Sequence, residues 1–352
     1  MTVPVPELIL TQSMESMQTE ATVRRKPRRD APVFTLGCIR SGTTLLYHML
    51  LSSGDFAVYR TESHALNLLE PRFGNLSIRR NRVKLMEAWL HSKLFERSGL
   101  NANDIREIVL SKCQNGGDFL RIVMEEIAKQ QGVRRWADCT PEHLLYLARI
   151  KETIPDALII HVIRDGRDVA LSADRQGYVQ RAPWDRRPSV MAAGLYWEWM
   201  VRRGREEGCK LGNDYIEVRY EELVRDPRST LSRLGEFIEH DLDYDRIQRV
   251  GIGSVSEPNT SFTTEAGEAN FHPIGRWRNA FSAENLEMLE ALIGGMLGNL
   301  GYELATTGGQ RQDWQDLRRM RSIYFRYFDS KLYLKSKTPL GKLLVTRDLS
   351  WL

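Results

Sequence analysis

The chain has 352 residues, of which 42% are hydrophobic and 27% are charged, which is typical of a globular protein with a sizeable core. A run of about eighteen apolar residues, the length of a transmembrane helix, is absent from the sequence, and the first residues lack the apolar core and cleavage site of a secretory signal. The formal net charge of +4 is too small to argue for a nucleic-acid partner. Taken as a whole chain, the sequence predicts a cytoplasmic protein.

The cysteines and histidines give no pattern of metal ligands. The chain has four cysteines, which are far apart and include no Cys-x-x-Cys pair: Cys38, Cys113, Cys139 and Cys209. A disulfide framework and a structural zinc site are therefore not expected, and reduced thiols are the default. We predict no metal cofactor.

The first segment, residues 1–31, is polar, lacks periodicity and ends in a basic run from Arg24 to Arg29. This composition is typical of a flexible, solvated tail. Contact of the basic run with a nucleic acid or a membrane is the alternative. Because the net charge gives a nucleic acid no further support, we predict a disordered tail and no nucleic-acid partner.

Ordered structure is expected from Val33 onward. The apolar run at residues 33–36 predicts a strand, and residues 43–52 have helical periodicity. A weaker strand is predicted at residues 56–58. Residues 78–131 indicate two or three helices with charged outer faces and no strand.

The middle of the chain contains the clearest strand. Before it, Pro141 is predicted to begin a helix that runs to about Thr153, with Thr140 as its N-cap. Residues 157–163 are almost unbroken in their apolar character. Such a run predicts burial on both faces, as in a parallel sheet covered by helices.

A long helix at residues 189–210 and a strand at residues 215–219 follow. Strands that alternate with helices predict an α/β fold with a central parallel sheet flanked by helices. We predict one P-loop-type domain over residues 32–305, with helical insertions. Residues 251–275 are too long for a simple connection, so they are expected to form a functional or mobile loop.

The turn between the first strand and the first helix has the composition of a phosphate loop. Gly37 and Gly42 have the spacing of the Walker A glycines, but Thr43 stands where the lysine should follow. An ATPase or kinase needs that lysine, so ordinary ATP hydrolysis is disfavoured. The cation lies inside the loop, as Arg40. Backbone N–H groups and the helix dipole converge at such a turn, which favours phosphate or sulfate binding over a simple turn.

A second ligand motif follows the buried strand directly. Residues 164–172 read Arg-Asp-Gly-Arg-Asp-Val-Ala-Leu-Ser, and ligands of open α/β sheets bind at such strand ends. A strand end followed by two helical turns can bring Arg164 and Ser172 toward one phosphate. The alternative is that Arg167 and Asp168 form only an ion pair at the helix terminus.

Four segments, in family order, resemble the motifs of sulfotransferases that use 3′-phosphoadenosine 5′-phosphosulfate (PAPS): residues 40–44, 164–172, 217–223 and 275–279. The resemblance is strongest to the branch of tyrosylprotein and bacterial carbohydrate sulfotransferases, and it covers residues 33–280. It implies that the 5′-phosphosulfate lies on Arg40, Ser41, Gly42, Thr43 and Thr44. It also implies that Arg164 and Ser172 hold the 3′-phosphate, that Tyr220 lies beside the adenine, and that the loop with Trp277 and Arg278 closes over the nucleotide.

The resemblance implies an enzyme that moves a sulfuryl group from PAPS to a hydroxyl group of an acceptor. A carbohydrate, a glycolipid or another metabolite could be that acceptor, and no motif selects among them. Sulfuryl transfer resembles phosphoryl transfer in needing positioning, neutralisation of the leaving group and removal of the acceptor proton. Arg40 is expected to neutralise the leaving oxygen. PAPS has no β- and γ-phosphates to bridge, so no metal is required.

A general base is expected just after the second predicted strand. Related enzymes carry a catalytic glutamate at nearly this distance beyond the loop, so Glu62 is our first choice, provided that burial raises its pKa. His64 needs no raised pKa to act as a base near neutral pH, so it is the alternative. A surface position for both residues is the third interpretation.

The sequence departs from the family pattern at residues 138–143, which read Asp-Cys-Thr-Pro-Glu-His. Many relatives have a lysine at the position of Cys139, where it binds the sulfuryl group or protonates the leaving phosphate. Cys139 carries no positive charge. Arg40 or His143 could take over that role.

Two other functions are compatible with the fold. A P-loop kinase is one alternative, and the missing lysine argues against it. A non-catalytic nucleotide-binding protein is the other. The presence of Arg40, Glu62, Arg164 and Ser172 argues against that alternative, whereas Cys139 argues for it.

The last segment, residues 306–352, is predicted to be a basic, aromatic helical extension. From residue 311 to the end it has ten Lys and Arg against four Asp and Glu. Its apolar residues do not form one clean helical stripe. We therefore expect it to pack against the body of the protein or a second subunit of a homodimer. Contact with an anionic membrane surface is the alternative, and disorder is the third interpretation.

Overall fold

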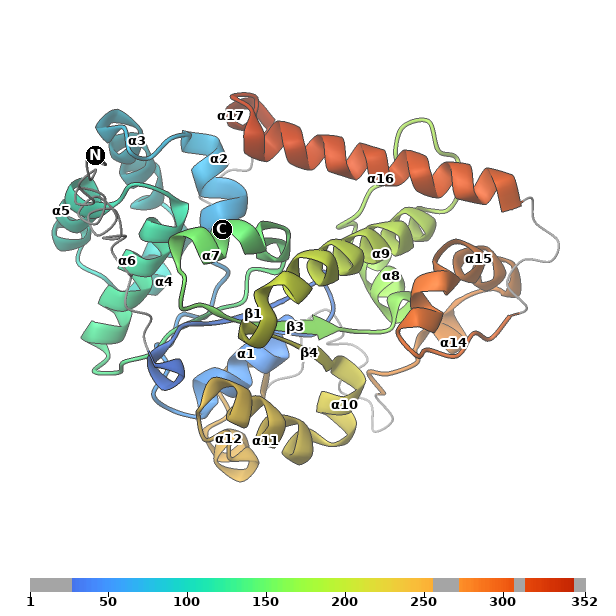
Figure 1. Cartoon of the computed structure of the whole chain (residues 1–352), viewed down its shortest axis with the longest axis horizontal. Helices are drawn as coiled ribbons and strands as arrows, with labels where there is room; N and C mark the ends of the chain where they lie inside the picture. The colour runs from blue at the N-terminus through green and yellow to red at the C-terminus, as the bar shows by residue number, and fades with distance from the viewer. Residues whose placement is uncertain (1–26, 256–271, 307–313, 345–352) are drawn as a thin grey trace, which may run out of the picture.

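A computed structural model describes residues 27–255, 272–306 and 314–344 (Figure 1). The strands are β1 (Val33–Gly37), β2 (Ala137–Asp138), β3 (Leu158–Ile163) and β4 (Tyr215–Arg219). The helices are α1 (Thr43–Ser52), α2 (Glu70–Phe73), α3 (Arg79–Trp89), α4 (Lys93–Ser98), α5 (Ala102–Lys112), α6 (Gly116–Gln130), α7 (Leu147–Thr153), α8 (Gly166–Arg175), α9 (Ser189–Gly208), α10 (Tyr220–Arg225), α11 (Pro227–Ile238), α12 (Tyr244–Val250), α14 (Trp277–Ala280), α15 (Ala283–Asn299), α16 (Trp314–Lys337) and α17 (Gly341–Leu344). A π-helical turn at Ala65–Leu69 precedes α2.

The four strands form one parallel sheet in the order β2-β1-β3-β4. Successive residues of a strand point to opposite faces, so both faces can be apolar. Phe34 and Leu36 belong to the core cluster that includes α9, whereas Val33 and Val162 belong to the cluster that includes α1 and α11. Figure 1 shows α9 on one side of the sheet and α1, α11 and α12 on the other. The predicted α/β class with helices on both faces is confirmed.

The predicted elements agree with the structure to different degrees. The helix at residues 43–52 and the strand at residues 215–219 have the predicted bounds. The strand predicted at residues 56–58 is wrong, because only a single bridge joins Phe56 to Arg135. The region 78–131 contains four helices, α3 to α6, where we predicted two or three.

The segment that begins at Pro141 differs from its prediction. It is a 3₁₀-helix (Pro141–Tyr146) that continues into α7, and the side chain of Thr140 does not cap it. The hydroxyl of Thr140 instead accepts a hydrogen bond of 2.9 Å from the backbone N–H of Ser63. A tertiary contact has therefore replaced the local cap.

The long helix α16 lies over α9, and α17 contacts α2 (Figure 1). Four side chains of α16 are buried at spacings of three or four residues: Leu317, Met320, Tyr324 and Phe328. This spacing puts them on one face of the helix. Within residues 314–344 the extension thus packs against the chain's own body, which was one of the predicted alternatives. No helix in the described ranges is long and apolar enough to cross a membrane.

Candidate functional site

The phosphate-loop segment connects β1 to α1 through a tight backbone turn. A side chain at Gly37 would place its Cβ 2.5 Å from the carbonyl oxygen of Val162, so glycine is required for close strand packing. Arg40 and Gly42 have φ angles of 69° and 93°. At Gly42, a Cβ would also overlap the ring of Tyr220. The loop and Tyr220, each of which the sequence assigns to the nucleotide site, are therefore in close contact.

Polar groups of the loop lie at the N-terminus of α1. Ser41 and Thr43 are buried, and Thr44 is half-buried. The side-chain oxygen of Ser41 has no hydrogen-bond partner among the described residues. A buried hydroxyl without a partner is costly, whereas an anion at a helix N-terminus would accept its hydrogen bond.

Arg164 extends from the end of β3 toward this loop. Its Nη1 donates a hydrogen bond of 3.0 Å to the carbonyl oxygen of Arg40, and its guanidinium lies 4.4 Å from the centre of the Tyr220 ring. Its Nη2 donates to the carbonyl oxygen of Pro273. Its Nε is buried and has no hydrogen-bond partner within the described ranges. Arg164 thus retains one unsatisfied donor at the predicted nucleotide site.

Arg40 joins the two predicted phosphate motifs directly. Its Nε donates a hydrogen bond of 2.9 Å to the hydroxyl of Ser172 on α8. Burial lowers the pKa of Arg40, and the nearby charge of Arg164 adds to that effect. An arginine nevertheless stays protonated in proteins. Two cations that converge in a partly buried place would be stabilised by an anionic ligand.

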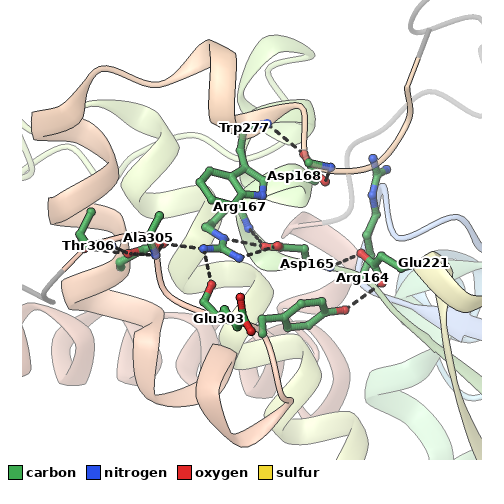
Figure 2. A network of polar contacts seen from close by, with 12 residues as sticks. Arg164, Asp165, Arg167, Asp168, Glu221, Trp277, Glu303, Ala305 and Thr306 are labelled. Carbon is green, nitrogen blue, oxygen red and sulfur yellow. Dashed lines mark hydrogen bonds and ion pairs between the residues drawn. The ribbon is translucent and has the colours of Figure 1, made fainter. Parts of the chain in front are cut away.

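The late loop is attached to α8 through Asp168, as Figure 2 shows. The Asp168 carboxylate accepts hydrogen bonds of 2.7 Å from the backbone N–H of Gly275 and 3.1 Å from that of Trp277. Arg278 lies with its guanidinium 4.4 Å from the centre of the Trp277 ring. The predicted nucleotide loop is therefore held beside the second phosphate motif.

Arg167 and Asp168 do not form the ion pair that we considered as an alternative. Arg167 pairs instead with Asp165 at 2.7 Å (Figure 2). It also pairs with Glu290 of α15 at 2.5 Å. The guanidinium of Arg167 also lies 3.8 Å from the centre of the Trp277 ring. Since only 2% of Trp277 is exposed, its indole packs on Arg167 inside the protein.

Sequence reasoning missed two carboxylates that support this motif. Glu290 accepts hydrogen bonds from Arg167 and from the backbone N–H groups of Ala305 and Thr306. Glu221 accepts one of 2.9 Å from the backbone N–H of Asp165. Burial raises the pKa of Glu221. An acidic residue within an apolar helical stretch, as at Glu290, is the signal that could have indicated such a role.

The candidate base lies on a separate segment. The carboxylate of Glu62 is 3.4 Å from Nε2 of His64, so the two predicted alternatives are neighbours. The Glu62 side chain is 40% exposed, whereas that of His64 is 10% exposed. Glu62 therefore has access to a ligand, and the burial on which its choice as the base depends is incomplete.

Residues 138–143 support the backbone beside Glu62. Thr140 Oγ1 accepts hydrogen bonds from the N–H groups of Ser63 and His64. Asp138 in turn accepts from the hydroxyl of Thr140 and lies 2.8 Å from Nδ1 of His143. His143 Nε2 accepts from a backbone N–H, so its proton lies on Nδ1, toward Asp138.

Cys139 occupies the position at which many relatives have a lysine, so this position carries no positive charge. The thiol is buried, and burial raises its pKa well above the ordinary value. It is therefore neutral near pH 7. The nearest replacement suggested by sequence, His143, is fully buried and engaged with Asp138. A different lysine, Lys335 of α16, comes within 3.2 Å of the neighbouring Glu142 and was missed by sequence reasoning.

The sheet explains why these segments meet. The phosphate loop, residues 138–143, Arg164 and Tyr220 each follow the carboxyl end of a different strand. Because all four strands are parallel, these ends lie at one edge of the sheet. Ligands of open α/β sheets bind at that edge. In the described ranges, no cluster of three or more His, Cys, Asp or Glu side chains could hold a metal ion.

The sequence and the fold of this chain resemble those of known proteins. The model of the sulfotransferase family matches residues 32–244, more than half of the chain. A sulfotransferase domain of the Synechococcus PCC 7002 olefin synthase is similar, with 19% identity and a TM-score of 0.50, over 80% of this chain and 98% of that domain. A sulfotransferase domain from the curacin biosynthetic pathway has 16% identity and a TM-score of 0.51, over 80% and 99%. None of the curated proteins compared matches the chain.

Proposed function

Because the chain belongs to the sulfotransferase family, we propose that it transfers a sulfuryl group from PAPS to a hydroxyl group of an acceptor. The observation that carries this proposal is the meeting of two phosphate motifs at Arg40. Its side chain contacts Ser172, and its carbonyl oxygen accepts from Arg164. A ligand with two separated anionic groups suits such a site better than a single phosphate.

Each end of PAPS has a proposed set of partners. The 5′-phosphosulfate would bind Arg40, the loop N–H groups and the hydroxyls of Ser41, Thr43 and Thr44. The buried Ser41 oxygen and the Arg164 Nε lack partners among the described residues. The 5′-phosphosulfate would accept a hydrogen bond from Ser41, and the 3′-phosphate would accept one from Arg164 Nε. The 3′-phosphate would bind Arg164 and Ser172. Tyr220 would lie beside the adenine, and the loop with Trp277 and Arg278 would cover it.

The proposed reaction is an in-line transfer. The acceptor oxygen forms a bond to the sulfur of PAPS while the bond from sulfur to the 5′-phosphate oxygen breaks. Glu62 takes the acceptor proton, and Arg40 stabilises the charge on the leaving 3′,5′-bisphosphate. Binding of an acceptor would cover the Glu62 carboxylate and raise its pKa toward that of a useful base. His64 is the alternative base.

The proposal is tested by ligand binding and turnover together. Adenosine 3′,5′-bisphosphate should raise the melting temperature, whereas ATP with magnesium should not. The opposite result would identify a kinase. Purified protein is then incubated with cell extract and sulfur-labelled PAPS, and labelled acceptors are identified by mass spectrometry. Binding without any transfer of label would indicate a non-catalytic nucleotide-binding protein.

The end of the extension supports a second proposal, that the protein contacts an anionic membrane surface, where a lipid-linked acceptor would lie. Tyr333 is 61% exposed and Leu343 is 71% exposed, close in sequence to the lysines Lys331 and Lys342. Exposed apolar groups beside cations favour contact with an anionic membrane surface. Sedimentation with anionic and neutral vesicles tests this proposal. Salt-sensitive binding to anionic vesicles that is lost in the variant Leu343→Ser would support it, and equal recovery with both vesicles would contradict it.

A further inference from the structure

The C-terminal end of α16 reaches the segment that carries the candidate base. Lys335 Nζ lies 3.2 Å from the Glu142 carboxylate, although the two residues are 193 positions apart. The chain then turns sharply into α17 at Gly341, where a Cβ would overlap the carbonyl oxygen of Lys335 and come within 3.2 Å of that of Pro71. This turn fixes Lys335 against the body of the protein.

The contact with Glu142 determines how the next side chain is oriented. Glu142 Oε2 lies 2.8 Å from Nδ2 of Asn67, which belongs to the π-helical turn. An ionised carboxylate can only accept hydrogen bonds, so the NH₂ group of Asn67 must face it. Burial raises the pKa of Glu142, but Lys335 and Asn67 outweigh this effect and hold it below the ordinary value. The carboxylate therefore stays ionised and the amide keeps one orientation.

The same amide group selects the tautomer of His64. Nδ2 of Asn67 carries two hydrogens, and the second faces Nδ1 of His64 at 3.4 Å. Nδ1 must then accept, so the ring proton lies on Nε2. That nitrogen is the one that lies 3.4 Å from the carboxylate of Glu62. The contacts thus run from Lys335 to Glu62 through three intervening side chains.

We propose that Lys335 is a positioning residue, which orients the Glu62–His64 pair through Glu142 and Asn67. The proposal rests on the proposed role of Glu62, since an oriented pair matters only where one member handles a proton. In this arrangement a neutral His64 presents an N–H to the Glu62 carboxylate. The carboxylate is thereby held in place for the acceptor hydroxyl.

A purely structural role for Lys335 is the competing explanation. In that case the lysine anchors α16, and its removal lowers stability without changing the orientation of His64. The adjacent Lys337 provides a matched control. It lies on the same helix, is exposed, and has no ion pair or hydrogen bond within the described ranges.

The experiment compares Lys335→Met, Lys335→Arg, Lys337→Met and Glu142→Gln in the full chain. Protein with ¹⁵N-labelled histidine reports the tautomer of His64, whose signals are assigned with His64→Ala. Binding of adenosine 3′,5′-bisphosphate and turnover of PAPS are measured beside it. We expect Lys335→Met to mix the two tautomers and to lower kcat about ten-fold, with a nearly unchanged Kd. Lys335→Arg keeps the positive charge, so it should keep the single His64 tautomer and a kcat near that of the wild type. Lys337→Met should also resemble the wild type.

Two further results decide the proposal. Lys335→Met should add little in the Glu142→Gln background, because both changes break one chain of contacts. The proposal is overturned if His64 keeps the Nε2–H tautomer in Lys335→Met, or if kcat and bisphosphate binding fall together with the melting temperature. If Lys335→Met does not fold, Glu142→Gln answers the tautomer question. The tautomer is read without substrate, so a wild type that fails to turn over PAPS would refute the proposed function alone.

Discussion

The donor side of the candidate site, made of the phosphate loop, Arg164 and Ser172, is built differently from its base side. Each donor motif is one contiguous segment that follows a strand, and its groups meet because the strands are parallel. On the base side, Glu62 is supported by residues 138–143 and by Lys335, from distant parts of the chain. A contiguous motif is a property of local sequence, whereas the base-side network depends on how helices pack.

The difference implies that the two sides can be altered separately. Donor-side changes should act mainly on the binding of the nucleotide, since those groups contact its phosphates in the proposed complex. Base-side changes should act mainly on turnover, because a base works in the transition state. The first two predictions below test that separation, and the other two test how the base side and the donor side are held in the fold.

The largest effect is expected for Glu62→Gln. Loss of a general base typically lowers turnover by about 10²–10⁴-fold, and the affinity for adenosine 3′,5′-bisphosphate should hardly change. PAPS turnover and calorimetric titration measure the two quantities. His64→Ala is the matched comparison. If Glu62→Gln keeps near-normal turnover and His64→Ala loses it, then His64 is the base.

Arg164→Met should weaken binding of adenosine 3′,5′-bisphosphate by roughly ten- to a hundred-fold, the effect of losing one charged hydrogen bond. Binding of adenosine 5′-phosphosulfate, which lacks the 3′-phosphate, should be nearly unaffected. Titration with both nucleotides makes the comparison. Arg228→Met, which removes an exposed arginine paired with Asp245, is the control. Equal losses for both nucleotides would refute the assignment of Arg164 to the 3′-phosphate.

Asp138→Asn should lower the free energy of unfolding by about 1.5–3 kcal/mol at neutral pH, as expected for a charged hydrogen-bond acceptor. Burial raises the pKa of Asp138, but His143, Ser63 and Thr140 outweigh it and hold the pKa below its ordinary value. A depressed folded pKa gives stability that is present above about pH 4 and is lost as the pH falls through the folded value.

Urea unfolding at several pH values checks this dependence on Asp138. The difference between wild type and variant should shrink below about pH 4, where the unfolded wild-type carboxyl is protonated. A difference that is constant with pH would mean that ionisation of Asp138 does not contribute.

The smallest effect concerns the close approach of the loop to Tyr220. Gly42→Ala should destabilise the protein by about 1–3 kcal/mol more than Gly54→Ala, because of overpacking. Both glycines have a similar positive φ, 93° and 87°, but nothing lies within 4 Å of a Cβ at Gly54. Gly54→Ala therefore isolates the backbone strain. Thermal unfolding of the two variants gives the difference, and equal losses would mean that the Tyr220 contact yields easily.

Local sequence patterns predicted most of the fold. The apolar run of β3 and the periodicity of α1 indicated elements that the structure contains, because burial on a sheet and helix amphipathicity leave local traces. Residues 56–58 also look like a strand, but only Phe56 pairs, and its partner Arg135 lies just before the two-residue strand β2. A strand forms only where a partner segment of sufficient length lies beside it, and the local sequence of residues 56–58 does not show whether such a partner exists.

The candidate site was predicted less evenly. The sequence motifs assigned Arg40, Arg164, Ser172 and Tyr220 to one nucleotide site, and these residues are neighbours in the structure. The roles of the site residues stay predictions until they are tested by mutation. Thr140 and Lys335 could not be placed from sequence, because each acts on a residue more than seventy positions away.

The hydrogen bond between the Arg40 guanidinium and the Ser172 hydroxyl connects the two phosphate motifs. A ligand fragment that takes Arg40 Nε as its own donor breaks this bond and frees the Ser172 hydroxyl for the other fragment. The first fragment to bind therefore loses the free energy of this hydrogen bond, and the second fragment does not lose it again. We therefore expect thermodynamic cooperativity: sulfate at the loop should tighten the binding of adenosine 3′-monophosphate, and by reciprocity the nucleotide should tighten the binding of sulfate by the same factor.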